Sequence, residues 1–446
     1  MRRPRIGPAA LPVLGLAGLV LLSGCGTFLG KGETDRPLPG KRVSILAVDR
    51  GLSPDRAIAE LDVSLPPPYV NDAWPQAGGS AAHAMYHLQL GDTPKRKWKS
   101  DVGEGSGDDR HILAQPLVVG GTVYAMDARS QVTAFDSESG RRLWRTDVEL
   151  EEEDGGYFGG GLAYEDGRLF VTTGFAIIFA LDAQSGEIIW QQRVTGPMRA
   201  APTVSGGRVF ATTLDNRTFA LAADNGRRLW EHTGVQEIAG LLGGASPAVA
   251  GSVVVVPYSS GELHALLVEN GRELWSDVLT PVNRFDPVSN LAQIKGLPVI
   301  DRGLVLAISH AGRMVAIDLR RGIRAWELEA GGVQMPWTAG DFIFLLTTES
   351  ELICVVRQSG RVRWVRALPR FEDPEDLEGP IGWFGPVLAG DRLIVTSSTG
   401  DAISISPYTG ELLGRLRLPG TPTVAPVVAN NTLYILTEDA DLVAIR

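Results

Sequence analysis

Short runs in which apolar and polar residues alternate recur along most of the chain. Val123–Met126, Leu169–Thr172 and Val209–Thr212 show the two-residue period of a β-strand and are rich in β-branched and aromatic residues. Each run is followed by a second short apolar segment, a polar turn that ends in glycine, and a segment with tryptophan. The pattern predicts antiparallel strands joined by tight hairpins.

The repeating unit is clearest between Ala134 and Trp144, which enclose the turn Asp-Ser-Glu-Ser-Gly. In seven copies a small residue lies six positions before the glycine, and a closing residue lies four positions after it. Aspartate can bond its own backbone in a turn, and glycine adopts the positive φ that a short hairpin needs. Gly414 closes the last copy, where the aromatic residue is lost. We interpret the tryptophans as structural side chains between neighbouring sheets: Trp98, Trp144, Trp190, Trp230, Trp275, Trp326 and Trp364.

The hairpin glycines are about 45 residues apart on average, which is the period of a β-propeller blade. A proline-containing segment ahead of each unit opens a further strand, which makes four strands per repeat. An eighth repeat begins at Val424 and is one strand short at Arg446, and Lys95–Lys99 can supply the missing strand. This pairing removes an open sheet edge. The sequence therefore predicts an all-β, eight-bladed β-propeller of four-stranded blades, closed by an N-terminal strand.

Residues 1–24 have the pattern of a lipoprotein signal peptide. Three arginines precede the apolar stretch Leu11–Leu22, which leads into Leu-Ser-Gly-Cys. By resemblance to bacterial lipoproteins, cleavage leaves Cys25 as an N-terminus that carries three acyl chains, enough for stable anchoring. The alternative is a retained transmembrane helix, but the run is short and interrupted by proline.

The rest of the chain divides into a tether and the propeller. Residues 25–71 are expected to form a lipidated tether with one short helix, since Ser53-Pro54-Asp55 is a helix-start signal. Residues 72–446 are expected to form the propeller. The second cysteine, Cys354, occupies the small strand position that is alanine in most repeats, so we expect it to be buried and free of any disulfide.

Charge and motifs argue against several function classes. The formal net charge of −10 makes the chain a poor partner for nucleic acid. His83 and His87 are spaced i, i+4 on a possible helical turn but lack an apparent third metal ligand. No phosphate loop, Gly-x-Ser-x-Gly or His-Glu-x-x-His pattern is present. We expect no catalytic residue, no metal and no cofactor.

The repeats resemble those of pyrroloquinoline-quinone dehydrogenases, which are also eight-bladed. Those enzymes carry an adjacent cysteine pair beside the quinone and a calcium ion bound by carboxylates. This chain has two cysteines, and they are not adjacent. Two alternatives stay open at this point: a quinoprotein dehydrogenase, and a periplasmic propeller that binds a small ligand in its channel.

The lipobox, tether and eight repeats together resemble the outer-membrane protein assembly factor BamB family. Trp74-Pro75-Gln76, the Asp-x-x-Ser-Gly hairpins and Leu442–Ile445 carry the likeness. The resemblance implies a non-enzymatic scaffold of the β-barrel assembly (BAM) complex, anchored by lipid in the outer membrane and facing the periplasm. It implies BamA, through a POTRA domain, and other BAM subunits as partners, with nascent outer-membrane proteins as further candidates.

The family contacts its partner through a loop that enters the fourth repeat. Leu241 and Leu242 hold the matching place here, and two leucines between glycines on a polar face can form an exposed apolar anchor. The alternative is that they fold down to plug the ring. In the next loop, Gln293-Ile294-Lys295 stands where the family has paired aspartates. The expected partner-binding residues are Ile238, Leu241, Leu242, Arg284, Asp286 and Asn290.

Overall fold

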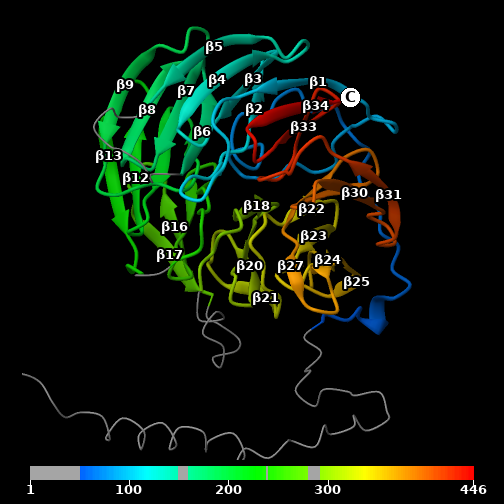
Figure 1. Cartoon of the computed structure of the whole chain (residues 1–446). Helices are drawn as coiled ribbons and strands as arrows, with labels where there is room; N and C mark the ends of the chain where they lie inside the picture. The colour runs from blue at the N-terminus through cyan, green and yellow to red at the C-terminus, as the bar shows by residue number, and fades with distance from the viewer. Residues whose placement is uncertain (1–50, 149–158, 238–239, 280–291) are drawn as a thin grey trace, which may run out of the picture. The chain divides into compact units, whose positions relative to one another are not determined.

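The computed structural model describes residues 51–148, 159–237, 240–279 and 292–446. Eight four-stranded sheets are arranged around a central axis like the blades of a propeller (Figure 1). Within the described residues the one helical element is a short 3-10 helix, so the predicted all-β, eight-bladed propeller is confirmed. Those residues contain no helix with the length and apolarity needed to cross a membrane.

Each of the first four blades consists of four consecutive strands, ordered from the channel to the rim. Blade 1 contains β2 (Leu117–Val119), β3 (Thr122–Met126), β4 (Gln131–Asp136) and β5 (Arg142–Asp147). Blade 2 contains β6 (Gly160–Glu165), β7 (Arg168–Thr173), β8 (Ile177–Asp182) and β9 (Ile188–Arg193). Blade 3 contains β10 (Thr203–Ser205), β11 (Arg208–Thr212), β12 (Arg217–Ala222) and β13 (Arg228–Thr233). Blade 4 contains β14 (Ala248–Ala250), β15 (Val253–Pro257), β16 (Glu262–Leu267) and β17 (Glu273–Val278).

The remaining blades repeat this order until the last. Blade 5 contains β18 (Val299–Asp301), β19 (Leu304–Ile308), β20 (Met314–Asp318) and β21 (Arg324–Leu328). Blade 6 contains β22 (Trp337–Ala339), β23 (Phe342–Leu346), β24 (Glu351–Val356) and β25 (Val362–Ala367), and a hairpin of β26 (Phe371–Asp373) and β27 (Glu378–Pro380) follows it. Blade 7 contains β28 (Trp383–Leu388), β29 (Leu393–Ser397), β30 (Asp401–Ile405) and β31 (Leu412–Arg417). Blade 8 contains β32 (Val427–Ala429), β33 (Thr432–Leu436), β34 (Asp441–Ile445) and β1 (Arg96–Asp101).

The two ends of the propeller sequence meet in blade 8. Strand β1 pairs antiparallel with β34, so that Trp98 lies opposite Ala444 (Figure 1). The Glu138 carboxylate, in the hairpin of blade 1, accepts a hydrogen bond of 2.8 Å from Arg446 and another from Lys97. The predicted closure by an N-terminal strand is confirmed, and Glu138 joins both chain segments to the next blade.

The tryptophans lie at the seams between blades. The indole N–H of Trp98 donates to the carbonyl of Ser137 in the hairpin of the next blade, at 2.9 Å. The hairpin glycine packs against the same ring: Gly140 has a φ of +71°, and a Cβ on it would lie 2.7 Å from Cδ2 of Trp98. Glycine and tryptophan therefore recur together because one rests on the other across each seam. The other tryptophans that donate to the next blade are Trp144, Trp190, Trp230, Trp275, Trp326 and Trp364.

The seam between blades 7 and 8 is built differently. Gly414 stands at the tryptophan position of β31, and β34 of blade 8 pairs with the distant β1 instead of running into a hairpin. A cavity of about 440 Å³ lies here, and Leu413, Gly414 and Leu433 are among the residues that line it. The missing ring and the missing hairpin thus leave space at this seam.

Residues 71–90 run around the inside of the ring and bond to all eight blades in turn. The backbone of this segment is irregular, and φ is positive at His83 and Tyr86. The helical turn considered for His83 and His87 is therefore absent. Both imidazoles are buried and bond to the carbonyls of Pro298 and Pro66. From blade 8 through blade 7, the bonded pairs are Asn71 with Val428, Trp74 with Val118, Pro75 with Tyr164, Gln76 with Val204, Ala81 with Val249, Ala82 with Ile300, Tyr86 with Trp337, and Leu88 with Leu388.

Residues 51–70 lie against blade 6. The 3-10 helix η1 (Arg56–Ile58) is capped by Asp55, whose carboxylate accepts from the Ala57 N–H at 2.8 Å. The Asp55 N–H donates to the Val362 carbonyl on β25 at 2.8 Å, and Val63 is buried in the core of the ring. Where the tether ends and the propeller domain begins stays a prediction.

Candidate partner-binding loop and central channel

The loop at residues 240–247 leads into β14 and reaches the central channel. Its glycines permit a sharp path, since Gly243 has a φ of +92°. Gly243, Gly244 and Ser246 line the central cavity, whereas neither Leu241 nor Leu242 does. Both leucines are half-buried. This position is contrary to the alternative in which the leucines plug the ring.

One buried glutamine holds the loop. The Leu241 N–H donates to Oε1 of Gln293, and Nε2 of Gln293 donates to the carbonyl of Gly243 at 3.2 Å. Because both ends of a single amide are used, the backbone on either side of Leu242 is fixed. In the sequence, Gln293 stands out only as a departure from the family's aspartates, and no motif indicates its role in holding the loop.

The other predicted site residues cannot be placed beside the leucines. Ile238, Arg284, Asp286 and Asn290 lie outside the described residues, as does Cys25. Their roles stay predictions.

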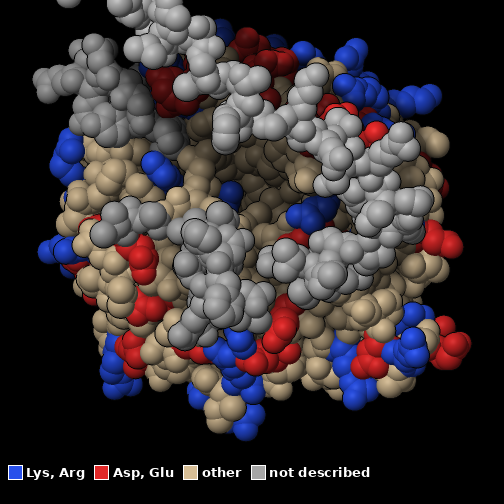
Figure 2. All heavy atoms as spheres, turned by 60° about the horizontal axis from the view of Figure 1, so that its bottom comes forward, with Lys and Arg blue, Asp and Glu red and all other residues tan. Residues whose placement is uncertain are grey.

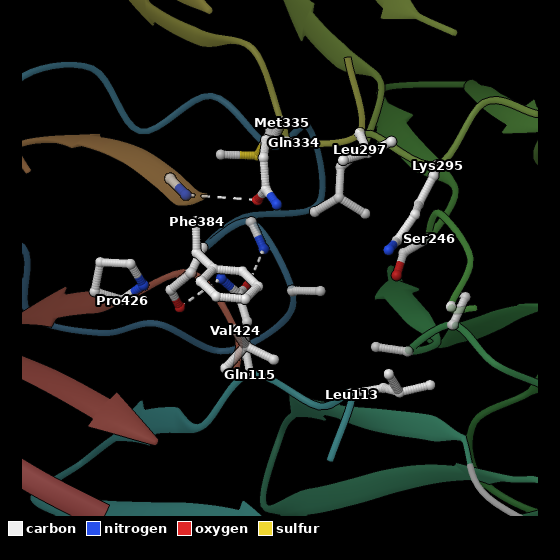
Figure 3. A pocket seen from close by; sticks show the side chains of 18 of the residues that line it. Leu113, Gln115, Ser246, Lys295, Leu297, Gln334, Met335, Phe384, Val424 and Pro426 are labelled. Atoms are coloured by element: carbon white, nitrogen blue, oxygen red, sulfur yellow. Dashed lines mark hydrogen bonds between the residues drawn. The ribbon is translucent and has the colours of Figure 1, made fainter. Parts of the chain in front are cut away.

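The central cavity has a volume of about 170 Å³ and lies where the inner strands converge. Leu113, Leu297 and Phe384 point toward it from three different blades (Figure 3). Its polar side chains include Gln115, whose amide accepts from the Gly78 N–H at 3.0 Å and donates to the Ala425 carbonyl at 3.2 Å. Through these two hydrogen bonds, Gln115 connects residues 71–90 to blade 8.

The cavity carries positive charge. Arg199 and Lys295 line it, and no Asp or Glu is found among the described residues of its wall. Burial lowers the pKa of both side chains, because a cation loses hydration there. In Figure 2 this face of the ring is hollowed at its centre, with Lys and Arg atoms inside the hollow. The described wall is suited to a small anionic or apolar group and contains no carboxylate for general acid–base catalysis.

The family described as outer membrane protein assembly factor BamB matches residues 91–155, 128–366 and 371–446. These segments cover well over half of the chain. The chain belongs to the BamB family. The resemblance that the lipobox and repeats suggested is confirmed.

A relative agrees with this family, and solved structures share the fold. The chain is 29% identical over 360 residues to the outer membrane protein assembly factor BamB of Salmonella typhimurium, a match that covers 79% of this chain and 89% of the relative. BamB from Moraxella catarrhalis has the same fold, with a TM-score of 0.68 at 21% identity over 79% of this chain and all of that one. A quinohemoprotein alcohol dehydrogenase from Comamonas testosteroni also matches, with a TM-score of 0.63 at 15% identity over 84% of this chain and 80% of the enzyme's. These two structural likenesses show the fold alone. The BamB family match is therefore the finding that distinguishes the assembly-factor function from the quinoprotein alternative.

Proposed function

We propose that this protein is a non-enzymatic scaffold lipoprotein of the outer-membrane β-barrel assembly (BAM) complex. The observation that carries the proposal is the BamB family match, which extends through all eight blades. In this role the protein binds a POTRA domain of BamA, associates with other BAM subunits, and aids the folding and insertion of outer-membrane proteins. Nascent outer-membrane proteins are a further candidate partner.

The side-chain chemistry supports a role without catalysis. Cys25 and Cys354 are the two cysteines, and they cannot form the adjacent pair of the quinone enzymes. Cys354 is buried, and burial raises the pKa of its thiol, which keeps it unreactive. The described wall of the cavity offers no carboxylate for a calcium ion beside a quinone.

The BamA contact belongs, in this proposal, to the loop of Leu241 and Leu242. Gln293 fixes the backbone of the loop, so the leucines lose little further freedom on binding. Apolar side chains on a preordered loop are suited to a hot spot. Ile238, Arg284, Asp286 and Asn290 are proposed to extend the contact on the same face.

The anchor is assigned to Cys25. Its lipid chains would hold the protein at the periplasmic leaflet of the outer membrane. The lipobox Leu-Ser-Gly-Cys supports this assignment. Residues 51–70, docked on blade 6, would connect the anchor to the ring.

A small ligand in the channel is the second candidate function. The cavity of about 170 Å³, with Arg199 and Lys295 in its wall, is the observation that favours it. Such a ligand would be anionic, because the buried ammonium of Lys295 gains from an opposite charge.

The test is an affinity purification of the tagged full-length protein, in detergent, from its own outer membrane. A different outer-membrane lipoprotein with the same tag is the control. Recovery of BamA and other BAM subunits, without quinone absorbance, is expected. Failure to recover any BAM subunit, together with quinone absorbance or saturable binding of a small anion, would contradict the scaffold function.

A further inference from the structure

The seam between blades 3 and 4 brings together two histidines and a glutamate that are far apart in the sequence. His232 lies on β13 at the rim of blade 3, whereas His264 and Glu273 lie on β16 and β17 of blade 4. One potential ligand atom of each residue lies within 4.8 Å of the other two. The two imidazole rings have centroids 4.7 Å apart.

The individual distances fit a shared ion. Oε2 of Glu273 lies 2.8 Å from Nδ1 of His264 and 3.7 Å from Nε2 of His232. Zinc binds imidazole nitrogen and carboxylate oxygen at about 2.0–2.1 Å in a tetrahedral arrangement, which separates neighbouring ligand atoms by about 3.3 Å. The two separations from Glu273 lie on either side of that value, and the two histidine nitrogens lie within 4.8 Å of each other, so side-chain rotations would bring the three atoms to ligand spacing.

The outer nitrogen of His232 has a hydroxyl partner, and the outer nitrogen of His264 faces a carboxylate. Nδ1 of His232 lies 2.8 Å from the hydroxyl of Tyr258, which in turn lies 3.1 Å from the Thr218 hydroxyl. Nε2 of His264 faces Oε1 of Glu262 at 3.7 Å. Metal-bound histidines characteristically donate their other N–H to a hydroxyl, carbonyl or carboxylate, which fixes the ring.

His264 supplies a second, independent indication. Its side chain is about nine-tenths buried, and its Nε2 has no hydrogen-bond partner. A neutral His264 that donates from Nδ1 to Glu273 turns the lone pair of Nε2 toward the Glu262 carboxylate, which is unfavourable. An ion on Nδ1 instead places the proton on Nε2, where it points at Glu262. The metal-bound arrangement therefore turns the proton of Nε2 toward the Glu262 carboxylate, 3.7 Å away.

We infer that His232, His264 and Glu273 form a binding site for a divalent transition-metal ion of the zinc type. Imidazole nitrogen with one carboxylate is a donor set for zinc or a similar ion and is unlike the all-oxygen set of calcium. Glu273 is partly exposed, so the ion reaches the site from solvent and the fourth position is open to water. Since the ligands come from two blades, the bound ion links blade 3 to blade 4.

The sequence pattern did not predict the site, because the three ligands form no motif.

The experiment uses the full-length protein without a polyhistidine tag, stripped of metal with a chelator and titrated with Zn²⁺ or Co²⁺. The wild type is expected to bind one ion per chain, to give the visible absorbance of tetrahedral Co²⁺, and to melt at a higher temperature with Zn²⁺. Glu273→Gln and His232→Gln should weaken Zn²⁺ binding by about 100-fold or more, and Glu262→Gln by about 10-fold, the effect of an outer partner.

Glu269→Gln is the matched control, because Glu269 is exposed in the same blade and its substitution removes the same charge as Glu273→Gln does. It should leave Zn²⁺ affinity unchanged. Equal affinity in the wild type and in Glu273→Gln would overturn the inference. So would failure of the wild type to bind either ion. Melting curves without metal establish that each variant is folded.

Discussion

The seams of the ring and the loop at residues 240–244 make contacts of opposite kinds. At a seam such as that of Trp364, the ring is buried, its N–H is satisfied by the Pro407 carbonyl at 3.0 Å, and Gly410 packs on its face. In the loop, Leu241 and Leu242 are half-buried, and one glutamine holds the backbone. Under the proposed function, stability and partner binding are carried by separate residues, so each can be changed without the other.

Removal of the closing strand should have the largest effect. Deletion of residues 94–100 eliminates β1 and exposes the edge of β34, which is a template for association with other chains. We expect aggregation and loss of a cooperative melt, measured by size-exclusion chromatography and calorimetry. A soluble monomer with a sharp melt would show that the ring does not depend on this strand.

Loss of one seam tryptophan should come next. Trp364→Ala removes a buried ring and its hydrogen bond, and we expect the free energy of unfolding to fall by about 3–5 kcal/mol. Denaturant unfolding measures it. Leu413→Ala, at the seam that lacks a tryptophan, is the control and should cost much less, because Leu413 is 57% exposed. Equal losses would mean that the tryptophan seams are not special.

The ion pairs at Glu138 should contribute least. Hydrogen bonds from Arg446 and Lys97 lower the pKa of Glu138 from 4.5 to about 2. A lowered carboxyl pKa stabilises the folded state above the unfolded value of 4.5, and this contribution is lost as the pH falls through about 2. Glu138 is mostly exposed, so the effect is small and screened by salt.

Glu138→Gln should therefore melt at a slightly lower temperature than the wild type at pH 6, and the difference should vanish near pH 2. Added salt should shrink the difference at pH 6. A difference that persists at pH 2 would mean that the carboxylate is not its source.

The sequence allowed the seams to be predicted because every blade repeats the same contact. The fixed spacing of glycine and tryptophan arises because one indole ring rests on one hairpin at each seam. This spacing was sufficient to predict the number of blades and the closing strand. Residues 71–90 could not be predicted in this way, because the segment bonds to each blade through a different residue at uneven spacing and no period results. The i, i+4 spacing of His83 and His87 pointed to a helical turn, which the positive φ of His83 excludes.

The candidate sites were predicted unevenly for the same reason. Leu241 and Leu242 could be proposed from their place in the family pattern, but Gln293 acts from another loop, 52 residues from Leu241. His232, His264 and Glu273 come from three strands of two blades, and they meet only through the register of each sheet and the packing of blade 3 against blade 4.

The central claim is that the loop binds BamA while the seams hold the ring. Its most direct test is the affinity of the purified periplasmic domain of BamA for the full-length wild type and for Leu241→Glu plus Leu242→Glu. Leu143→Glu is the matched control, since Leu143 is 43% exposed on β5. All three proteins should unfold with similar free energies. The account predicts that the double variant loses at least about 30-fold in affinity, the effect of one hot-spot residue, and that the control loses none. Equal affinity of all three folded proteins would contradict it.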